Sequence, residues 1–203
     1  MKDLTQQQEV GPYVVRHATA EDVHGARSVM LDTFYREFDY GYVPSWHSDV
    51  VDIHRSYLDN PRHTLVVAVR DGEVVATTGL HSRGPVHPPH PRWLCERYPS
   101  GRTAQLARVY VRPAHRRHGL ARVMVLMACE FAARTPGYDS VYLHTNVDIP
   151  GAEGFWRSLA TEVFDARTTG EHGGFGTVHF EIPIPWRDGA DHDHGSLVRA
   201  GGR

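Results

Sequence analysis

Lysine is almost absent from this chain of 203 residues, since Lys2 is the only one and every other basic residue is an arginine. A Walker-type phosphate loop needs a lysine ammonium in its Gly-Lys-Ser/Thr step, so that class of nucleotide site is excluded. Any phosphate that the protein holds must therefore be bound by arginine side chains and backbone amides.

The chain also has few cysteines, a net charge close to zero and no long apolar run. Cys95 and Cys129 are too few for a disulfide framework and lack metal-ligand spacing. With Lys+Arg 22 against Asp+Glu 24, the formal charge of −2 provides no basic field for nucleic acid or an anionic membrane. No run approaches the ~18 apolar residues of a membrane helix, and the first residues lack the apolar stretch of a signal peptide. We expect a cytoplasmic protein with no nucleic-acid or membrane partner.

Histidine, in contrast, is abundant, with 15 residues. A histidine-rich metal carrier is therefore one hypothesis, because three local pairs occur, namely His87/His90, His115/His118 and His192/His194. The pairs fall in different kinds of segment, and no acidic or thiol partner recurs at ligand spacing. We therefore expect no metal site; stoichiometric zinc or nickel in protein purified without an affinity tag would favour the carrier instead.

The hydrophobic pattern predicts a single domain over residues 1–186. Apolar spacing predicts helices after the Thr19–Asp22 capping box and over 46–57, 118–134 and 151–159. Strands are predicted at 13–17, 64–70, 73–80, 104–111, 140–145, 162–167 and 177–182. Asp71-Gly72 is a strong signal for a two-residue hairpin. Strand, helix and strand between 104 and 145 form a βαβ unit with parallel strands.

Two segments lie outside this pattern. Residues 82–103 interleave five prolines with histidine, arginine and aromatic residues, so we expect an inserted loop or lid. A Gly-rich turn is predicted at 170–176, and residues 187–203 form a polar, Gly-rich tail that we expect to be mobile.

The turn between the strand ending at Val111 and the long helix carries the clearest chemistry. Its sequence has the pattern Arg-x-x-Gly-x-Ala at Arg116, Gly119 and Ala121. A helix N-terminus presents unpaired N–H groups and partial positive charge, so backbone amides alone can bind a pyrophosphate. The small residues let the anion approach the backbone, and positive charge comes from Arg116, Arg117 and Arg122.

The segment from Leu106 to Leu159 resembles the core of the GNAT superfamily of acyl-CoA-dependent N-acyltransferases. Their acyl-CoA signature, Arg/Gln-x-x-Gly-x-Gly/Ala at a strand-to-helix turn, is matched by residues 116–121. A second family segment follows the next strand, and here it comprises Asn146, Ala152, Phe155 and Trp156. The resemblance implies a mixed α/β fold with a central, mostly antiparallel sheet of six to seven strands, about four flanking helices and a splayed parallel strand pair.

The resemblance also implies acetyl-CoA, or another acyl-CoA, as co-substrate, with its pantetheine arm between the strands that end at Val111 and Thr145. The predicted cofactor contacts are Val109, Tyr110, Val111, Arg116, Arg117, His118, Gly119, Leu120, Ala121, Arg122, Asn146, Phe155 and Trp156. Backbone groups of Val109 and Val111 would bind the arm, and Trp156 would pack near the thiol end.

Attack of an amine on a thioester passes through a tetrahedral oxyanion, and the Val111 amide is the predicted donor to it. Only the neutral amine attacks, so at pH 7 an amine of pKa near 10.4 must lose a proton at a cost of roughly 4.6 kcal/mol. Trp156 stands where many family members have a Tyr acid, and residues 104–108 lack the Glu base of many relatives. The candidates from elsewhere are Glu37, Asp39, Tyr40 and, preferred because histidine titrates near neutrality, His81. A low-pKa acceptor that needs no base is the alternative.

These residues predict an N-acyltransferase that acts on the amine of a small molecule by direct attack in a ternary complex. A protein or peptide amine is the rival acceptor, which would need an open groove where residues 82–103 would instead form a lid. The missing Tyr and Glu favour a second alternative, a non-catalytic acyl-CoA-binding module. Similarity to the family suggests a homodimer.

Overall fold

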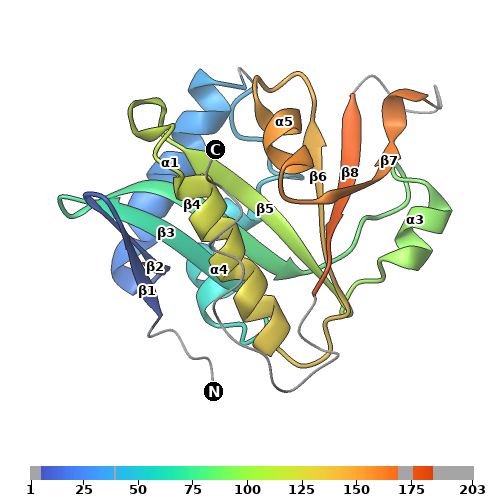
Figure 1. The fold of residues 1–203 in the computed structure, drawn as a ribbon, viewed down its shortest axis with the longest axis horizontal. Coiled ribbons are helices and arrows are strands. Elements are labelled where there is room, and N and C mark those ends of the chain that lie inside the picture. Colours follow the sequence, from blue (N-terminus) through green and yellow to red (C-terminus); the bar gives the residue numbers. More distant parts are fainter. Residues whose placement is uncertain (1–5, 39, 169–175, 185–203) are drawn as a thin grey trace, which may run out of the picture.

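A single mixed sheet forms the frame of the molecule. The computed structural model describes residues 6–38, 40–168 and 176–184, and in these residues an 8-stranded sheet has the order β1-β2-β3-β4-β5-β6-β8-β7 (Figure 1). The strands are β1 (Gln7–Val10), β2 (Tyr13–His17), β3 (Thr64–Arg70), β4 (Glu73–Ser82), β5 (Thr103–Val111), β6 (Ser140–Asn146), β7 (Thr161–Asp165) and β8 (Thr177–Ile182). β5 and β6 run parallel, and the other neighbouring strands are antiparallel.

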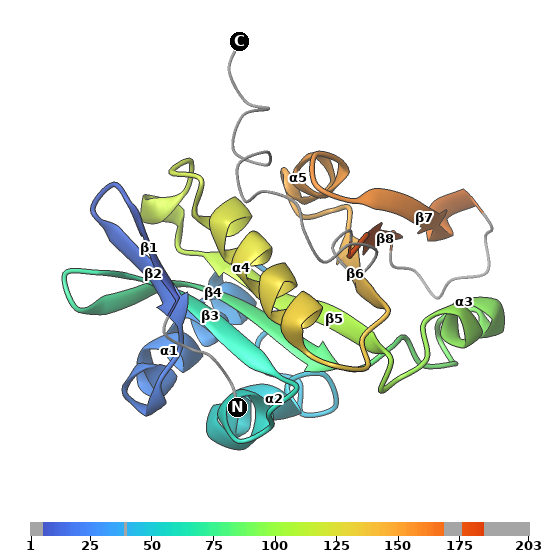
Figure 2. The same cartoon turned by 60° about the horizontal axis from the view of Figure 1, so that its bottom comes forward.

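Helices cover both faces of this sheet. The α-helices are α1 (Val23–Arg36), α2 (Ser48–Val51), α3 (Arg92–Arg97), α4 (Leu120–Arg134) and α5 (Ala152–Arg157). Short turns of other helix types are η1 (Ala20–Asp22), η2 (His54–Leu58), η3 (Pro113–His115) and η4 (Ala166–Thr168). Figure 2 shows α4 on one face of the β2–β5 part of the sheet and α1 and α2 on the opposite face.

Two apolar clusters follow from this layering. The α4 face buries side chains that include Leu80, Leu106, Met124 and Leu143. The α1 face buries a second set, among them Phe34, Ile53, Tyr57 and Leu65. Both faces of β3 are therefore covered, which explains its nearly continuous apolar sequence.

The predicted fold class is confirmed, with three differences in detail. The helix predicted over 46–57 is divided into α2 and η2, because Asp52 leaves the helical conformation with φ −127° and ψ 74°. The strand count exceeds six to seven because residues 7–10, which have no apolar alternation, pair with β2 as an edge strand. The 82–103 insert also contains a helix, α3. The Asp71-Gly72 hairpin is confirmed, since both residues have positive φ, 52° and 83°, as a type I′ turn requires. The turn predicted at 170–176, apart from Gly176, and the 187–203 tail lie outside the described residues.

A gap opens between the two parallel strands. Their pairing is confined to Thr103–Gln105 against Ser140–Tyr142. Beyond it, and within the described residues, β5 pairs only with β4 and β6 only with β8, and Figure 1 shows the two strands diverging. We call this separation of the two backbones, between residues 106–111 and 143–146, the β5–β6 gap.

Candidate active site

The turn before α4 is open. Gly119 caps the helix with φ +77°, and a Cβ added there would meet nothing within 4 Å. Arg117 also has positive φ, 69°, and the side chains of Arg116, Arg117 and His118 are exposed. The N–H groups of residues 117–122 have no hydrogen-bond acceptor among the described residues. An anion placed here would meet several unsatisfied donors and no blocking side chain.

Side chains from β2 and α1 hold this turn in place. The Tyr13 hydroxyl is hydrogen-bonded to His115 Nδ1 at 3.1 Å, and the Tyr13 ring lies 5.4 Å from the His118 ring. Arg116 Nε donates to the Val111 carbonyl at 3.0 Å, and its guanidinium forms an ion pair with Glu37. The Arg116 side chain is therefore directed toward the end of α1, and this leaves the turn with Arg117 and Arg122, which have no ion pair among the described side chains.

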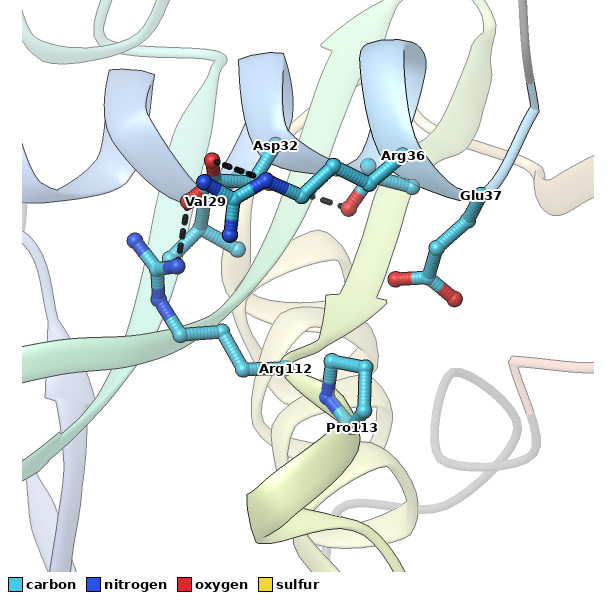
Figure 3. Close-up of a pocket in the computed structure, with 7 residues that line it drawn as sticks. Val29, Asp32, Arg36, Glu37, Arg112 and Pro113 are labelled. Carbon is cyan, nitrogen blue, oxygen red and sulfur yellow. Dashed lines mark hydrogen bonds and ion pairs between the residues drawn. The ribbon is translucent and has the colours of Figure 1, made fainter.

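A small pocket of about 90 Å³ lies where the end of β5 meets α1. Figure 3 shows Arg112 reaching Asp32 and the Glu37 carboxylate beside Pro113. The lining residues are Val29, Asp32, Thr33, Arg36, Glu37, Arg112 and Pro113. The pocket is too small for a nucleotide, and its ion pairs instead anchor the turn to α1.

The backbone of β5 presents donors to the β5–β6 gap. The Arg112 N–H donates to the Val75 carbonyl at 3.0 Å, and Tyr110 lies opposite Thr77 of β4. Alternate residues of a strand direct their backbone groups to opposite sides, so the N–H groups of Val109 and Val111 face away from β4 and toward the gap. This is the orientation that the predicted role of Val111 requires.

A bulge in β5 carries a buried ion pair. The register shifts between Thr77 and Gly79, and Arg108 opposite this step has φ +55°. The Thr77 hydroxyl donates to the Arg108 carbonyl at 2.8 Å. Arg108 Nε and Nη2 donate to Asp49 at 2.9 and 2.7 Å, and the Tyr57 hydroxyl donates to the same carboxylate at 2.6 Å. Although burial opposes ionisation, the hydrogen bonds from Arg108 lower the pKa of Asp49 to about 2.

The predicted proton-transfer residues lie in different environments. His81 Nε2 is 3.9 Å from Asp49 Oδ2, and burial lowers the pKa of His81 to about 3. Tyr40 stacks on His47 in a cluster of rings, and loss of hydration raises the pKa of Tyr40 to about 12. Glu37 is ion-paired with Arg116. Asp39 lies outside the described residues.

The second family segment has mainly structural contacts. Asn146 Oδ1 accepts the Asp148 N–H at 3.0 Å and so closes the turn after β6. Trp156 is 6% exposed and belongs to the α4-face cluster, and the Phe155 ring lies 4.8 Å from it. Contacts of these three residues with a cofactor stay predictions.

Polar residues line the face of the sheet opposite α4, and of these only His81 was selected from the sequence. His81 is paired with Gln105, Gln105 with Tyr142, and His144 with His179, across β4, β5, β6 and β8. We call this set the histidine face. The signal was the alternation in β6, where Val141 and Leu143 are buried under α4 and the intervening Tyr142 and His144 must point the other way.

The 82–103 insert packs beside the histidine face. The Tyr98 hydroxyl and Arg97 both donate to Glu181 of β8, at 2.6 and 3.0 Å, and the Tyr98 ring lies 4.9 Å from Tyr142. The His90 ring lies 5.1 Å from His144 and from His179. The role of the insert as a lid stays a prediction.

The residues that the structure describes lack the features of two other kinds of site. They contain no group of three or more His, Cys, Asp or Glu side chains that could hold a metal ion. Among the helices described, none is long and apolar enough to cross a bilayer.

Comparison with known proteins agrees with this arrangement. Residues 28–160 match the sequence model of the acetyltransferase (GNAT) family. Rat N-acetyltransferase 8 is 32% identical over 148 residues, an alignment that covers 68% of this chain and 59% of that protein. A Staphylococcus aureus GNAT-family acetyltransferase has TM-score 0.63 at 13% identity, covering 85% of this chain and 99% of its own. A Salmonella typhimurium protein described as an acetyltransferase, solved with its cofactor acetyl-CoA, has TM-score 0.62 at 13% identity, covering 90% and 100%.

Proposed function

The chain belongs to the acetyltransferase (GNAT) family, and from this membership we propose that it transfers the acetyl group of acetyl-CoA to the amine of a small molecule, by direct attack in a ternary complex. The observation that carries the proposal is the open turn at Gly119, which adjoins a parallel strand pair that separates after three register pairs. The N–H groups of residues 117–122 suit a pyrophosphate, and the β5–β6 gap suits an extended arm that bonds to a strand edge.

We assign the cofactor contacts to this chain's own groups. The amides of residues 117–121 would bind the phosphates, with Arg117 and Arg122 adding charge, and backbone groups of Val109 and Val111 would bind the arm. Bound acetyl-CoA supplies a thioester carbon open to attack. The Val111 N–H would donate to the carbonyl oxygen as negative charge develops, and such a donor is typically worth ~3 to 4 kcal/mol.

Of the sequence-based candidates for the base, His81 is the best placed, because it belongs to the histidine face. Glu37 is engaged by Arg116, and the raised pKa of Tyr40, about 12, suits a phenol that keeps its proton. His81 is neutral at pH 7, because burial holds its pKa at about 3.

A small acceptor is supported by what surrounds the histidine face. The insert packs along one side of it, and the exposed rings of Tyr40 and Trp46 lie on the side of the Asp49–Arg108 pair. An acetyltransferase of protein or peptide amines is the rival. Trp156 in place of an acidic hydroxyl favours a third reading, a module that binds acyl-CoA without turnover. Cytoplasmic location and homodimer formation stay predictions from sequence.

Calorimetry with CoA and thiol release from acetyl-CoA test the proposal together. We expect saturable CoA binding, and thiol release that depends on an added amine from a panel of alkylamines, arylamines and short peptides. Turnover on peptides alone would show that the acceptor is a protein or peptide amine. Binding without turnover on any amine would favour the module, and absence of CoA binding would refute the assignment.

A further inference from the structure

His144 stands at the mouth of the β5–β6 gap. It is two residues beyond Tyr142, the last residue of β6 that pairs with β5, and it points to the face opposite α4. Its neighbours in β6 are buried, whereas His144 is exposed. A group that approaches the gap from the histidine face would therefore meet this imidazole.

The groups around His144 come from three other elements and include no carboxylate among the described residues. Gln105 Nε2 of β5 lies 3.4 Å from His144 Nδ1. The rings of His90, His179 and Tyr142 lie 5.1, 5.8 and 6.1 Å from it. Although His144 is exposed at the surface, the packing of protein around its ring opposes protonation, and with the electrostatic influence of His90 and Arg108 this lowers the pKa of His144 to about 4.

His81 differs from His144 in both position and contacts. It lies on β4, which β5 separates from the gap. Its ring packs 4.5 Å from Tyr57, and its Nε2 faces Asp49. His81 is therefore fitted into the network of the buried ion pair, whereas His144 Nε2 has no partner among the described residues.

We propose that His144 is the general base that takes the proton from the acceptor amine, with Gln105 as the residue that positions its ring. The inference rests on the proposed function and adds to it a residue that the family signature does not include. A neutral imidazole at the gap can accept a proton only if its free nitrogen faces the acceptor. If the Gln105 amide is rotated by a half-turn, its oxygen accepts a hydrogen bond from the Nδ1–H of His144. In the tautomer that carries its proton on Nδ1, the lone pair is on Nε2 and is available to accept a proton.

The proton balance closes without a further reactant. His144 Nε2 takes one proton from the acceptor ammonium and gives it to water. The neutral amine then forms its N–C bond as the C–S bond breaks. After the N–C bond has formed, the nitrogen loses a second proton, which the departing thiolate takes up. The products are therefore the amide, CoA thiol and one proton in solution.

The test compares H144Q with H24Q, which changes an exposed histidine of α1, on two acceptors that differ in basicity. An alkylamine needs a base at pH 7, whereas an arylamine is already neutral. We expect H144Q to lower kcat on the alkylamine by about 10²-fold or more and kcat on the low-pKa amine by less than about tenfold, with CoA affinity unchanged. H24Q should change kcat on either amine by less than about threefold. Alkylamine turnover by H144Q within threefold of wild type, or equal losses on both amines, would overturn the assignment.

A second measurement titrates the imidazole itself, so its main readout is independent of turnover. The ring protons of His144, assigned by their loss in H144Q, are titrated by NMR in the wild type and in Q105E. A carboxylate at 105 should move the His144 midpoint upward by at least one pH unit and move the acid limb of kcat/KM with it. An unmoved midpoint would refute the Gln105 contact. If wild type binds CoA but acetylates no amine, the enzyme function itself fails.

Discussion

Gly119 is the residue on which the ligand-binding turn depends. Its φ of +77° lies in the left-handed region, where a side chain costs roughly 1–3 kcal/mol. Gly101, at the other end of β5, has φ +89° and equally open surroundings, so it offers a matched control. Gly119 precedes α4 at the proposed ligand site, whereas Gly101 precedes β5, where no ligand is expected.

We predict that G119V and G101V each lower the free energy of unfolding by about 1–3 kcal/mol, and that only G119V weakens CoA binding, by at least tenfold. Urea unfolding and calorimetry on both variants measure the two effects separately. Equal CoA affinity in G119V and G101V would place the pyrophosphate elsewhere.

Asp49 makes stability depend on pH. Its pKa of about 2 lies below the ~3.9 of an unfolded aspartate, so its contribution is present above pH 4 and is lost as the pH falls through 2. The difference corresponds to about 2.5 kcal/mol at pH 7, and both side chains of the Asp49–Arg108 pair are only 14% exposed.

Replacing Asp49 by Asn should leave the buried Arg108 guanidinium uncompensated. We predict that D49N loses about 3–5 kcal/mol at pH 7 and that its stability falls less steeply than wild type between pH 4 and 2. D71N, which removes a surface pair with Arg70, should change stability by less than about 1 kcal/mol. Urea unfolding at several pH values checks this; parallel pH profiles for wild type and D49N would contradict it.

Some site residues could be predicted from the sequence, and others could not because they depend on contacts between distant segments. Gly119 was found because a local motif fixes its place between strand and helix. His144 was missed because its role comes from the point at which β6 parts from β5, and that point is set by pairing between segments about 40 residues apart. The side chain of Arg116 was predicted to face a phosphate, but it pairs with Glu37, from a helix that the motif does not contain.

The bounds of β5 could be predicted from the sequence, but its bulge could not. Its bounds were predicted to within one residue, at 104–111 against Thr103–Val111. Its bulge was not predicted, because left-handed backbone is normally indicated by Gly, Asn or Asp and here it falls on Arg108. The contacts that fix this conformation, to Asp49, Trp46 and Thr77, all come from other elements.

The insert was predicted only from its lack of periodicity, yet it is anchored to β8 through Glu181. Tyr98 is 1% exposed, and its ring packs on Tyr142. We predict that Y98A exposes the insert, so that trypsin cleaves after Arg92 or Arg97 at least tenfold faster than in wild type. V86A, which trims an exposed side chain of the same insert, should leave the cleavage rate unchanged. Similar rates for Y98A and V86A would show that other contacts hold the insert.

The whole molecule consists of two parts of one sheet that a short parallel pairing joins. β1–β5 with α1 and α4 form one part, and β6–β8 with α5 form the other. Three register pairs connect them. A ligand that binds the turn before α4 and lies along the β5–β6 gap would add contacts to both parts, so its binding should stabilise each of them.

Binding of CoA should raise the stability of the folded chain. CoA at 100 times its Kd should raise the free energy of unfolding by about 2.7 kcal/mol, because it binds only the folded chain. Amide hydrogen exchange should then slow at the start of α4 and also along β6 and β8, which lie across the β5–β6 gap from β5. In G119V, at the same CoA concentration, both effects should shrink together, since both depend on one binding event. Protection confined to α4 would mean that the ligand binds at the turn without entering the gap, and the proposed route of the thioester toward Val111 and His144 would then be wrong.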